Sequence, residues 1–311
     1  MGLWRSRIGP NPRRVRRQAN TIQSMSTQAL PTSTVEPKTA PAKVHPTAIV
    51  EKSVRLAPGV EVGPGCILRG DVSIGAGTRL IANVCVEGPC DIGENNTIYP
   101  FACIGFAPQD YKFTPGVTPT AGVRIGSNNL IRESVTIHAA SKTAHPTELG
   151  DRCMLMVNSH LGHDTVIGND VILANGALLA GHVRVGSNVM LSGNTAIHQF
   201  CRVGRFAFVS GGTVSAVDVP PFCIMGVRNT VTGLNRVGMR RNGVPREDIT
   251  LIDKAYRTVL VPRLPRDEML SALADLANQS VYVRELRDFI AEKTGKAIAL
   301  ARQGAEDDAA M

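Results

Sequence analysis

Four of the seven histidines fall between residues 160 and 198, at His160, His163, His182 and His198. His163 is followed directly by Asp164. An imidazole that titrates near neutral pH can take a proton from a hydroxyl group, and a neighbouring carboxylate can orient the ring and stabilise its charged form. A lone histidine is more often a turn residue bonded to a nearby carbonyl group. Several histidines in one region, however, predict a site for proton transfer.

The elements that must hold these histidines can be inferred from a sequence pattern that repeats every six residues. Apolar residues recur at every sixth position from Val44 to Ile104 and again from Ile125 to Val209, with one gap at Thr143. A helix repeats at 3.6 residues and a strand at 2, so neither explains strict sixes. Each hexad fits one short strand with a corner, and three hexads close a coil that stacks about 4.8 Å from the next. The sequence therefore predicts a parallel β-helix with ladders of aliphatic side chains as its core.

The period also places the histidines relative to one another. His163 and His182 are 19 residues apart, one coil plus one residue, so we expect them on adjacent coils near the same edge. The hexads break at about residues 106–123 and lose their pattern at 138–146. Loops that leave a repeat scaffold often carry function. We therefore expect the histidines to form a site beside such a loop.

Beyond Pro220 and Pro221 the hexads end and the pattern becomes helical. Helical spacing is found in three stretches, residues 245–260, 265–278 and 280–302. The first stretch opens with a proline followed by acidic residues, which is typical of a helix start. The predicted parts are a transit peptide and linker at 1–40, a β-helix at 41–235, a helical domain at 236–303 and a tail at 304–311.

The net charge of +8 comes from the N-terminus. Six arginines lie between Arg5 and Arg17 and no acid precedes Glu36, whereas residues 36–311 hold 28 basic against 26 acidic residues. An arginine- and serine-rich segment without acids predicts a mitochondrial transit peptide, and a basic tail for nucleic acid or membranes is the alternative. The near-neutral remainder argues against a nucleic-acid partner, and no apolar run is long enough for a transmembrane segment. Seven scattered cysteines without a CxxC pair favour free thiols in a reducing compartment.

Several motifs carry a family resemblance. They are NSHLGHD at 158–164, LANGALLAGH at 173–182, AIHQF at 196–200, DVPP at 218–221, QDYK at 109–112 and GLNRVGMRRNG at 233–243. With these motifs the chain resembles the UDP-N-acetylglucosamine O-acyltransferases over about residues 44–260. The resemblance implies a left-handed parallel β-helix with a C-terminal α-helical domain, assembled as a homotrimer. It also implies transfer of an (R)-3-hydroxyacyl group from acyl carrier protein to the 3-hydroxyl of UDP-N-acetylglucosamine in lipid A synthesis.

The resemblance also assigns roles to single residues, without a cofactor or a metal. His163 would be the general base, Asp164 would orient it, and the Gly181 N–H would stabilise the oxyanion formed at the thioester. His182, His198 and Gln199 would hold the sugar diphosphate or the amide end of the acyl donor, and His160 would contact the acyl-donor side. Asp110 and Lys112 would bind the sugar ring and a phosphate. Asn235 and Arg241 would hold the nucleotide, and Gly211 would lie at the end of the acyl chain. Two positions depart from the family pattern: Val237 replaces an acid and Asn242 a second basic residue.

Three alternatives remain open on the same scaffold. A zinc site like that of γ-class carbonic anhydrases could use His138, His160 and His163, since its ligands come from neighbouring coils. A non-catalytic β-helix subunit of a larger assembly is the second alternative. The third is the related N-acyltransferase that acts later in lipid A synthesis.

Overall fold

The structure, a computed structural model, describes residues 40–302. The predicted tail at 304–311 and, apart from Ala40, the predicted transit peptide and linker at 1–40 lie outside the described residues. Within residues 40–302 no helix combines the length and the apolar character needed to cross a membrane.

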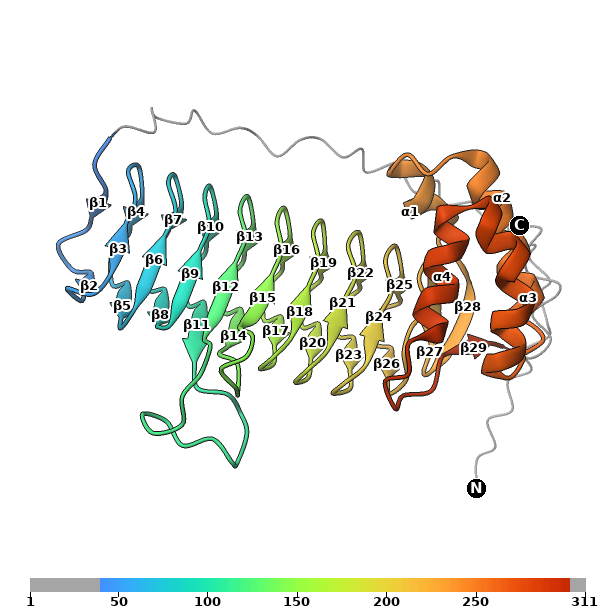
Figure 1. Ribbon diagram of the computed structural model, residues 1–311. Coiled ribbons are helices and arrows are strands. Elements are labelled where there is room, and N and C mark those ends of the chain that lie inside the picture. Colours follow the sequence, from blue (N-terminus) through green and yellow to red (C-terminus); the bar gives the residue numbers. More distant parts are fainter. Residues whose placement is uncertain (1–39, 303–311) are drawn as a thin grey trace, which may run out of the picture. The chain divides into compact units, whose positions relative to one another are not determined.

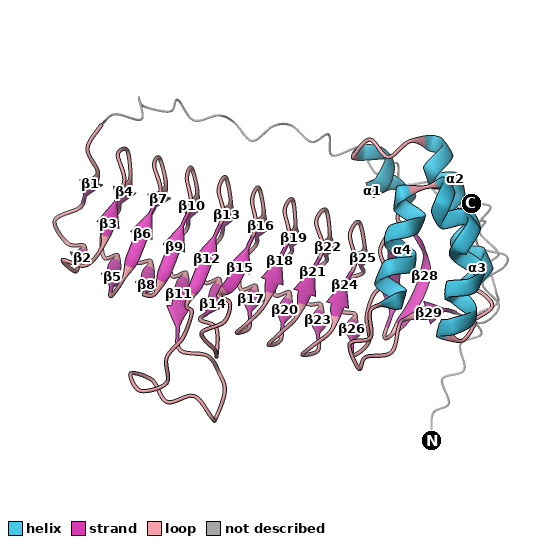
Figure 2. Ribbon diagram, viewed as in Figure 1, coloured by secondary structure: helices cyan, strands magenta, loops and turns pink. Residues whose placement is uncertain are grey.

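Up to Ser215 the chain visits three parallel sheets in turn, one short strand at a time (Figures 1 and 2). Sheet 1 has the strand order β1 (Lys43–Val44), β4 (Glu61–Val62), β7 (Arg79–Leu80), β10 (Thr97–Ile98), β13 (Leu130–Ile131), β16 (Met154–Leu155), β19 (Ile172–Leu173), β22 (Met190–Leu191), β25 (Phe208–Val209), β27 (Cys223–Val227), β28 (Thr230–Leu234) and β29 (Leu300–Ala301). Sheet 2 has the order β2 (Ile49–Val50), β5 (Ile67–Arg69), β8 (Cys85–Glu87), β11 (Cys103–Phe106), β14 (Thr136–His138), β17 (His160–Leu161), β20 (Leu178–Leu179), β23 (Ala196–Ile197) and β26 (Val214–Ser215). Sheet 3 has the order β24 (Arg202–Val203), β21 (Arg184–Val185), β18 (Val166–Ile167), β15 (Thr147–Leu149), β12 (Val123–Ile125), β9 (Cys90–Ile92), β6 (Val72–Ile74) and β3 (Arg55–Leu56).

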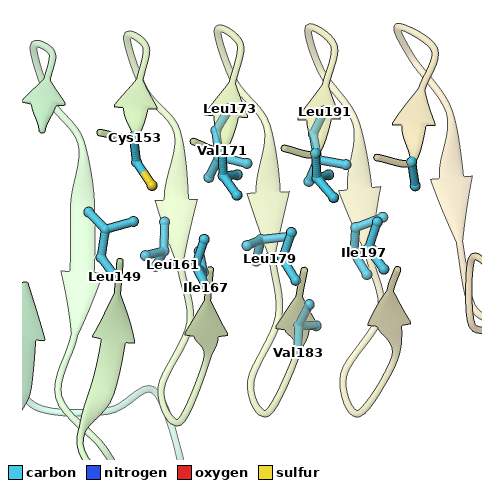
Figure 3. Packing of buried hydrophobic residues seen from close by; sticks show 14 of the residues in the cluster. Leu149, Cys153, Leu161, Ile167, Val171, Leu173, Leu179, Val183, Leu191 and Ile197 are labelled. Atoms are coloured by element: carbon cyan, nitrogen blue, oxygen red, sulfur yellow. The ribbon is translucent and has the colours of Figure 1, made fainter. Parts of the chain in front are cut away.

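The core consists of the aliphatic ladders that the period of six predicts. Leu161, Leu179 and Ile197 lie one above the other in sheet 2 and are at most 2% exposed. Figure 3 shows these side chains pointing inward together with those of the other two sheets. Burying one such side chain stabilises the fold by about 1.5–3 kcal/mol, so the repeated apolar position supplies much of the stability of each coil.

Corners between the strands hold residues in the left-handed backbone region. Asp164, His182 and Phe200 have φ angles of 58°, 62° and 64°. Strands one coil apart pair Leu161 with Leu179, the same spacing that separates these corners, so the three corners are equivalent positions on consecutive coils. The repeat therefore stacks their side chains in one column.

Two loops interrupt the coils where the hexads fail. Residues 107–122 separate β11 from β12, and this loop extends away from the coils in Figure 1. Residues 139–146 separate β14 from β15. Paired residues on neighbouring coils are usually 18 positions apart, but Ile92 and Ile125 are 33 apart, and Ile137 and Leu161 are 24 apart. Both loops lie where the sequence predicted them.

After the coils, β27 and β28 form an antiparallel hairpin that the sequence did not predict. The helices are α1 (Arg236–Arg241), α2 (Arg246–Val259), α3 (Arg266–Gln279) and α4 (Val281–Ala291). The prediction of a helix over 280–302 is wrong beyond Ala291. The chain turns at Gly295, whose φ is 80°, and returns as an extended segment ending in β29, parallel to β28.

A buried ion pair ties this C-terminal part to the last coils. Arg202, 4% exposed, donates from Nε to Oδ2 of the fully buried Asp218 at 2.9 Å. Its other nitrogens donate to the Glu292 carboxylate at 2.8 Å and to the Phe289 carbonyl group at 2.9 Å. Because a buried charge must be paired, these contacts fix where the chain leaves α4.

Candidate active site

The corner column of Asp164, His182 and Phe200 lies beside the predicted base. The His182 ring lies flat on the Phe200 ring, with centroids 4.5 Å apart and an interplanar angle of 7°. His163 meets His182 edge-on, with centroids 5.1 Å apart. The predicted proximity of His163 and His182 on adjacent coils is confirmed.

His163 is bonded through one ring nitrogen to Asp164. The two atoms, Nδ1 and Oδ2, are 2.6 Å apart, and the side chains are only 16% and 13% exposed. Burial alone would raise the pKa of Asp164, but hydrogen bonds from His163 and Ser141 lower it to about 2. The carboxylate is therefore ionised near neutral pH and can only accept hydrogen bonds. Nδ1 of the neutral ring must then carry the proton, which leaves the lone pair on Nε2.

The second loop, residues 139–146, holds the Asp164 carboxylate in place. The Ser141 N–H lies 3.2 Å from Oδ1 and 3.1 Å from Oδ2 of Asp164, and the Ser141 hydroxyl donates to Oδ2 at 2.7 Å. The Asp164 N–H donates to the Thr147 hydroxyl oxygen at 2.8 Å. Since these bonds fix Asp164, they also fix the His163 ring that donates to it.

Gly181, on the next coil, lies against the free nitrogen of His163. A Cβ atom on Gly181 would come within 2.6 Å of Nε2, so only glycine leaves room there. The Gly181 carbonyl accepts from the Phe200 N–H at 3.1 Å, whereas the Gly181 N–H donates to no acceptor within residues 40–302. A free backbone N–H beside a basic lone pair suits the stabilisation of an oxyanion next to a general base.

His163 and Gly181 line a cavity of about 470 Å³ on sheet 2. Part of its wall is a row of apolar side chains on consecutive strands, Leu178, Ala196 and Val214, which are partners in register. Its polar lining includes Gln109, His138, His160, His198 and Gln199. A polar end that holds a base and an apolar wall suit a substrate with a polar head and a hydrocarbon chain.

Two further histidines of the cavity are neutral near pH 7. Burial lowers the pKa of His160 to about 4 and also lowers the pKa of His138. The His160 Nδ1 lies 2.7 Å from the Thr136 hydroxyl oxygen, and the two imidazoles meet edge-on at 5.2 Å. Among the residues that the structure describes, the buried Nδ1 of His138 has no hydrogen-bond partner. These rings can exchange hydrogen bonds with a substrate without bringing a charge to the cavity.

Both loops bring charged residues close to His182. Burial lowers the pKa of His182, the charges of Asp164 and Asp110 oppose this shift, and the charge of Lys142 reinforces it. Asp110, a predicted sugar-binding residue, therefore lies near the site. The side chain of Lys112 is exposed on the same loop, and the backbone N–H of Lys112 donates to Oδ1 of Asp110 at 3.0 Å.

Seven predicted site residues do not line this cavity: Asp110, Lys112, Asp164 and His182, which are described above, and Gly211, Asn235 and Arg241. The Asn235 amide is engaged within the chain, donating to the Phe206 carbonyl group at 2.8 Å and accepting from the Gly238 N–H at 2.8 Å as the N-cap of α1. Arg241 and Gly211 are exposed. Nucleotide and chain-length roles for them stay predictions.

Three residues near the base were not predicted from the sequence: Ser141, Lys142 and Phe200. Phe200 could have been found by adding 18 to His182, because equivalent corners stack. Ser141 and Lys142 lie in the second loop, where the hexad pattern is lost and no register can be assigned. Their only signal was the interruption itself.

The geometry does not support the zinc-site alternative. Within residues 40–302, the potential ligand atoms that lie within 4.8 Å of one another belong to His163, Asp164 and His182, not to the trio with His138 and His160. Ligands of a tetrahedral zinc lie about 3.3 Å apart, given bonds of about 2.0–2.1 Å. The Nδ1 of His163 and Oδ2 of Asp164 are 2.6 Å apart and share a proton. A metal there would break the bond that orients the base.

Known proteins resemble the chain over most of its length, and known families match parts of it. The family described as UDP N-acetylglucosamine O-acyltransferase, domain 2, matches residues 218–299, and the bacterial transferase hexapeptide family matches residues 146–181. The chain is 43% identical over 256 residues to the acyl-[acyl-carrier-protein]–UDP-N-acetylglucosamine O-acyltransferase of Thermodesulfovibrio yellowstonii, covering 81% of this chain and 98% of that protein.

Solved structures agree as well. The UDP-N-acetylglucosamine acyltransferase of Francisella novicida superposes with a TM-score of 0.80 at 33% identity, covering 84% of this chain and 95% of that one. The Arabidopsis UDP-N-acetylglucosamine acyltransferase gives a TM-score of 0.68 at 32% identity, covering 85% and 99%. These matches confirm the predicted left-handed parallel β-helix with a C-terminal helical region. On these grounds the chain belongs to the UDP-N-acetylglucosamine O-acyltransferase family.

Proposed function

We propose that this protein transfers an (R)-3-hydroxyacyl group from acyl carrier protein to the 3-hydroxyl group of UDP-N-acetylglucosamine, the first step of lipid A synthesis. One observation carries the chemical part of the proposal. The ionised Asp164 holds the proton of His163 on Nδ1, so that Nε2 lies beside Gly181 in the cavity wall as a base. Family membership supplies the identity of the two substrates.

In the proposed reaction, Nε2 of His163 takes the proton of the sugar 3-hydroxyl as its oxygen attacks the thioester carbonyl carbon. The resulting oxyanion accepts a hydrogen bond from the Gly181 N–H, and Asp164 stabilises the charged imidazole. The C–S bond then breaks, the acyl ester remains on the sugar, and His163 returns the proton to the thiolate of the carrier. No other proton donor or acceptor is needed for the balance.

The apolar row of Leu178, Ala196 and Val214 is the proposed place of the acyl chain. These side chains line the same cavity as the base and follow consecutive strands away from His160. Leu178 and Val214 are 46% and 36% exposed, so an acyl chain laid across them would cover apolar surface. Hydrocarbon binding at about 25 cal/mol per Å² then favours long acyl groups.

The partners in this proposal are an acidic carrier protein and two further copies of the chain. Exposed basic residues gather on the helices and their connections, and would steer an acidic carrier: Arg240, Arg241, Arg246, Lys254 and Arg263. The apolar side chains of Phe101, Tyr111 and Val117 are exposed at or beside the first loop and would be covered in a homotrimer. Light scattering should then give three times the chain mass of 33.2 kDa.

The proposal includes import into mitochondria, supported by the six arginines near the N-terminus. Residues 1–40 fused to a fluorescent protein should direct it to mitochondria. A matched fusion with Arg13, Arg14, Arg16 and Arg17 changed to glutamine should stay outside. Equal distribution of the two fusions would refute the targeting role.

The decisive experiment is an assay of the full chain with UDP-N-acetylglucosamine and 3-hydroxyacyl carrier protein. We expect an ester at the 3-hydroxyl, lost in His163→Ala and retained in His45→Ala, which removes an exposed histidine of the first coil. Circular dichroism should be the same for all three proteins. Turnover of His163→Ala near the wild-type value would exclude His163 as the base. One zinc ion per chain by elemental analysis would contradict the acyltransferase mechanism.

A further inference from the structure

The segment that follows α4 brings a lysine to the edge of the cavity. The Lys296 Nζ lies 3.4 Å from Nδ1 of His198, although the two residues are 98 positions apart in the chain. His198 lines the cavity that holds His163 and Gly181. Within residues 40–302 no carboxylate lies within ion-pair distance of Lys296, so His198 is the contact that its ammonium group makes.

The position of Lys296 is set by the buried Asp218 of the DVPP motif. The Asp218 N–H donates to the Ala297 carbonyl group at 2.8 Å, and Oδ2 accepts from the Thr294 hydroxyl at 3.0 Å. The Thr294 hydroxyl oxygen in turn accepts from the Lys296 N–H at 3.3 Å. Residues on both sides of Lys296 are therefore tied to a group that is 0% exposed and already paired with Arg202. An anchored backbone lets a long side chain hold one position.

Two contacts compete for the same nitrogen of His198. Nδ1 lies 3.3 Å from the Gln199 carbonyl oxygen, a contact that needs a proton on Nδ1. An ammonium group has donors only, so the contact with Lys296 needs a lone pair on Nδ1. Each contact therefore selects a different tautomer of the neutral ring.

We propose that Lys296 is a positioning residue that fixes the Nε2–H tautomer of His198 and so turns this ring into a hydrogen-bond donor for the bound substrates. The oxygen atoms of a sugar diphosphate or of an acyl-donor amide are acceptors that such a donor suits. The choice of these ligands rests on the proposed function, whereas the tautomer itself does not.

The tautomer is measured first, on the full chain without substrates. Histidine labelled with ¹⁵N distinguishes a protonated from an unprotonated ring nitrogen, and the His198→Gln spectrum assigns the signals. We expect Nε2–H in the wild type and a shift toward Nδ1–H in Lys296→Met, where the Gln199 carbonyl group becomes the acceptor. Lys293→Met removes an exposed charge from the same segment and should leave the spectrum unchanged. An Nδ1–H ring in the wild type, or the same tautomer in Lys296→Met, overturns the proposal.

Kinetics then separate positioning from a general structural effect. Lys296→Met should lower kcat/KM roughly tenfold, the usual worth of one hydrogen bond to a bound ligand, and Lys296→Arg should recover most of it. In a His198→Gln background, Lys296→Met should have no further effect, because its action passes through that ring. Additive losses would overturn the positioning role. If the wild type transfers no acyl group at all, the proposed function fails while the tautomer result still decides the role of Lys296.

Discussion

Replacing Asp164 by asparagine tests which ring nitrogen of His163 carries the proton. Asp164 Oδ2 accepts from His163 Nδ1–H at 2.6 Å and from the Ser141 hydroxyl at 2.7 Å, while Oδ1 lies 3.2 Å from the Ser141 N–H. Asparagine keeps the size of the side chain but replaces one acceptor oxygen with an NH₂ donor. Either of these two atoms can face His163.

The Ser141 N–H lies 3.2 Å from Oδ1 and 3.1 Å from Oδ2, so it faces the amide nitrogen in either orientation. With the nitrogen in the place of Oδ2, the amide donates to Nδ1 of His163, and the Ser141 hydroxyl can rotate to accept. The ring is then forced into the tautomer with its proton on Nε2, where it cannot act as a base. With the oxygen in the place of Oδ2, Nδ1–H keeps an acceptor, but the charged imidazole loses the carboxylate that stabilises it. Both orientations therefore impair the base.

The size of the effect follows from the loss of the base. The same change in a serine-protease triad, which also produces the wrong tautomer, lowers kcat by about 10⁴, or about 5 kcal/mol. We expect Asp164→Asn to lower kcat by about 10³–10⁴ with a much smaller change in KM, measured as release of free thiol from the carrier. Ser141→Ala keeps the carboxylate and the N–H donor, so its loss should stay within about tenfold. A folded Asp164→Asn protein with kcat within tenfold of the wild type would refute this account of the base.

Three further changes probe the site and its support. Gly181→Ala places a Cβ atom 2.6 Å from Nε2 of His163, so the ring must move and kcat should fall about 100-fold at an unchanged Tm; full activity would contradict the close approach. His160 is held neutral with a pKa of about 4, below the usual 6.5, so the unfolded chain binds the proton first as pH falls. About 2 kcal/mol of stability, after allowance for partial exposure, should be present above pH 6.5 and lost between pH 6.5 and 4; urea unfolding of His160→Gln should lack this component. Arg202→Met leaves the buried Asp218 carboxylate without its cation and should cost about 3–5 kcal/mol by urea unfolding. Arg287→Met, at a partly exposed position on α4, should not reproduce this loss.

The coils could be predicted from the sequence because one physical requirement repeats in them. Every sixth residue must fill the same inward position, so the spacing alone predicts the ladder of Leu161, Leu179 and Ile197. The end of the chain has no such repeat. Residues 292–302 carry helical spacing, yet they form an extended return segment because contacts with Asp218 and β28 outweigh local preference. Local patterns could not reveal contacts with residues so distant in the chain.

The same distinction applies within the site. His163 with Gly181, and Asp164 with His182 and Phe200, follow from adding 18, so the periodic part of the site could be read from the sequence. Ser141 could not, because its loop lengthens one coil beyond the regular repeat and breaks the register. The residue that fixes the carboxylate thus lies where the repeat stops.

This arrangement has a physical reason. A regular coil presents equivalent corners at every level, and a corner alone gives a histidine no preferred tautomer. The free Nε2 of His163 requires an ionised carboxylate on its other side. Asp164 stays ionised in a largely buried place because it accepts from His163 and from two donors that Ser141 supplies from outside the repeat. In the same way, the extended segment after α4 supplies His198 with a donor from outside the coils, the ammonium group of Lys296. In both cases the coils set the distances between the rings, and the interruption of the repeat sets where their protons lie. Shortening the loop at 139–146 by six residues should therefore keep the coils intact and abolish acyl transfer.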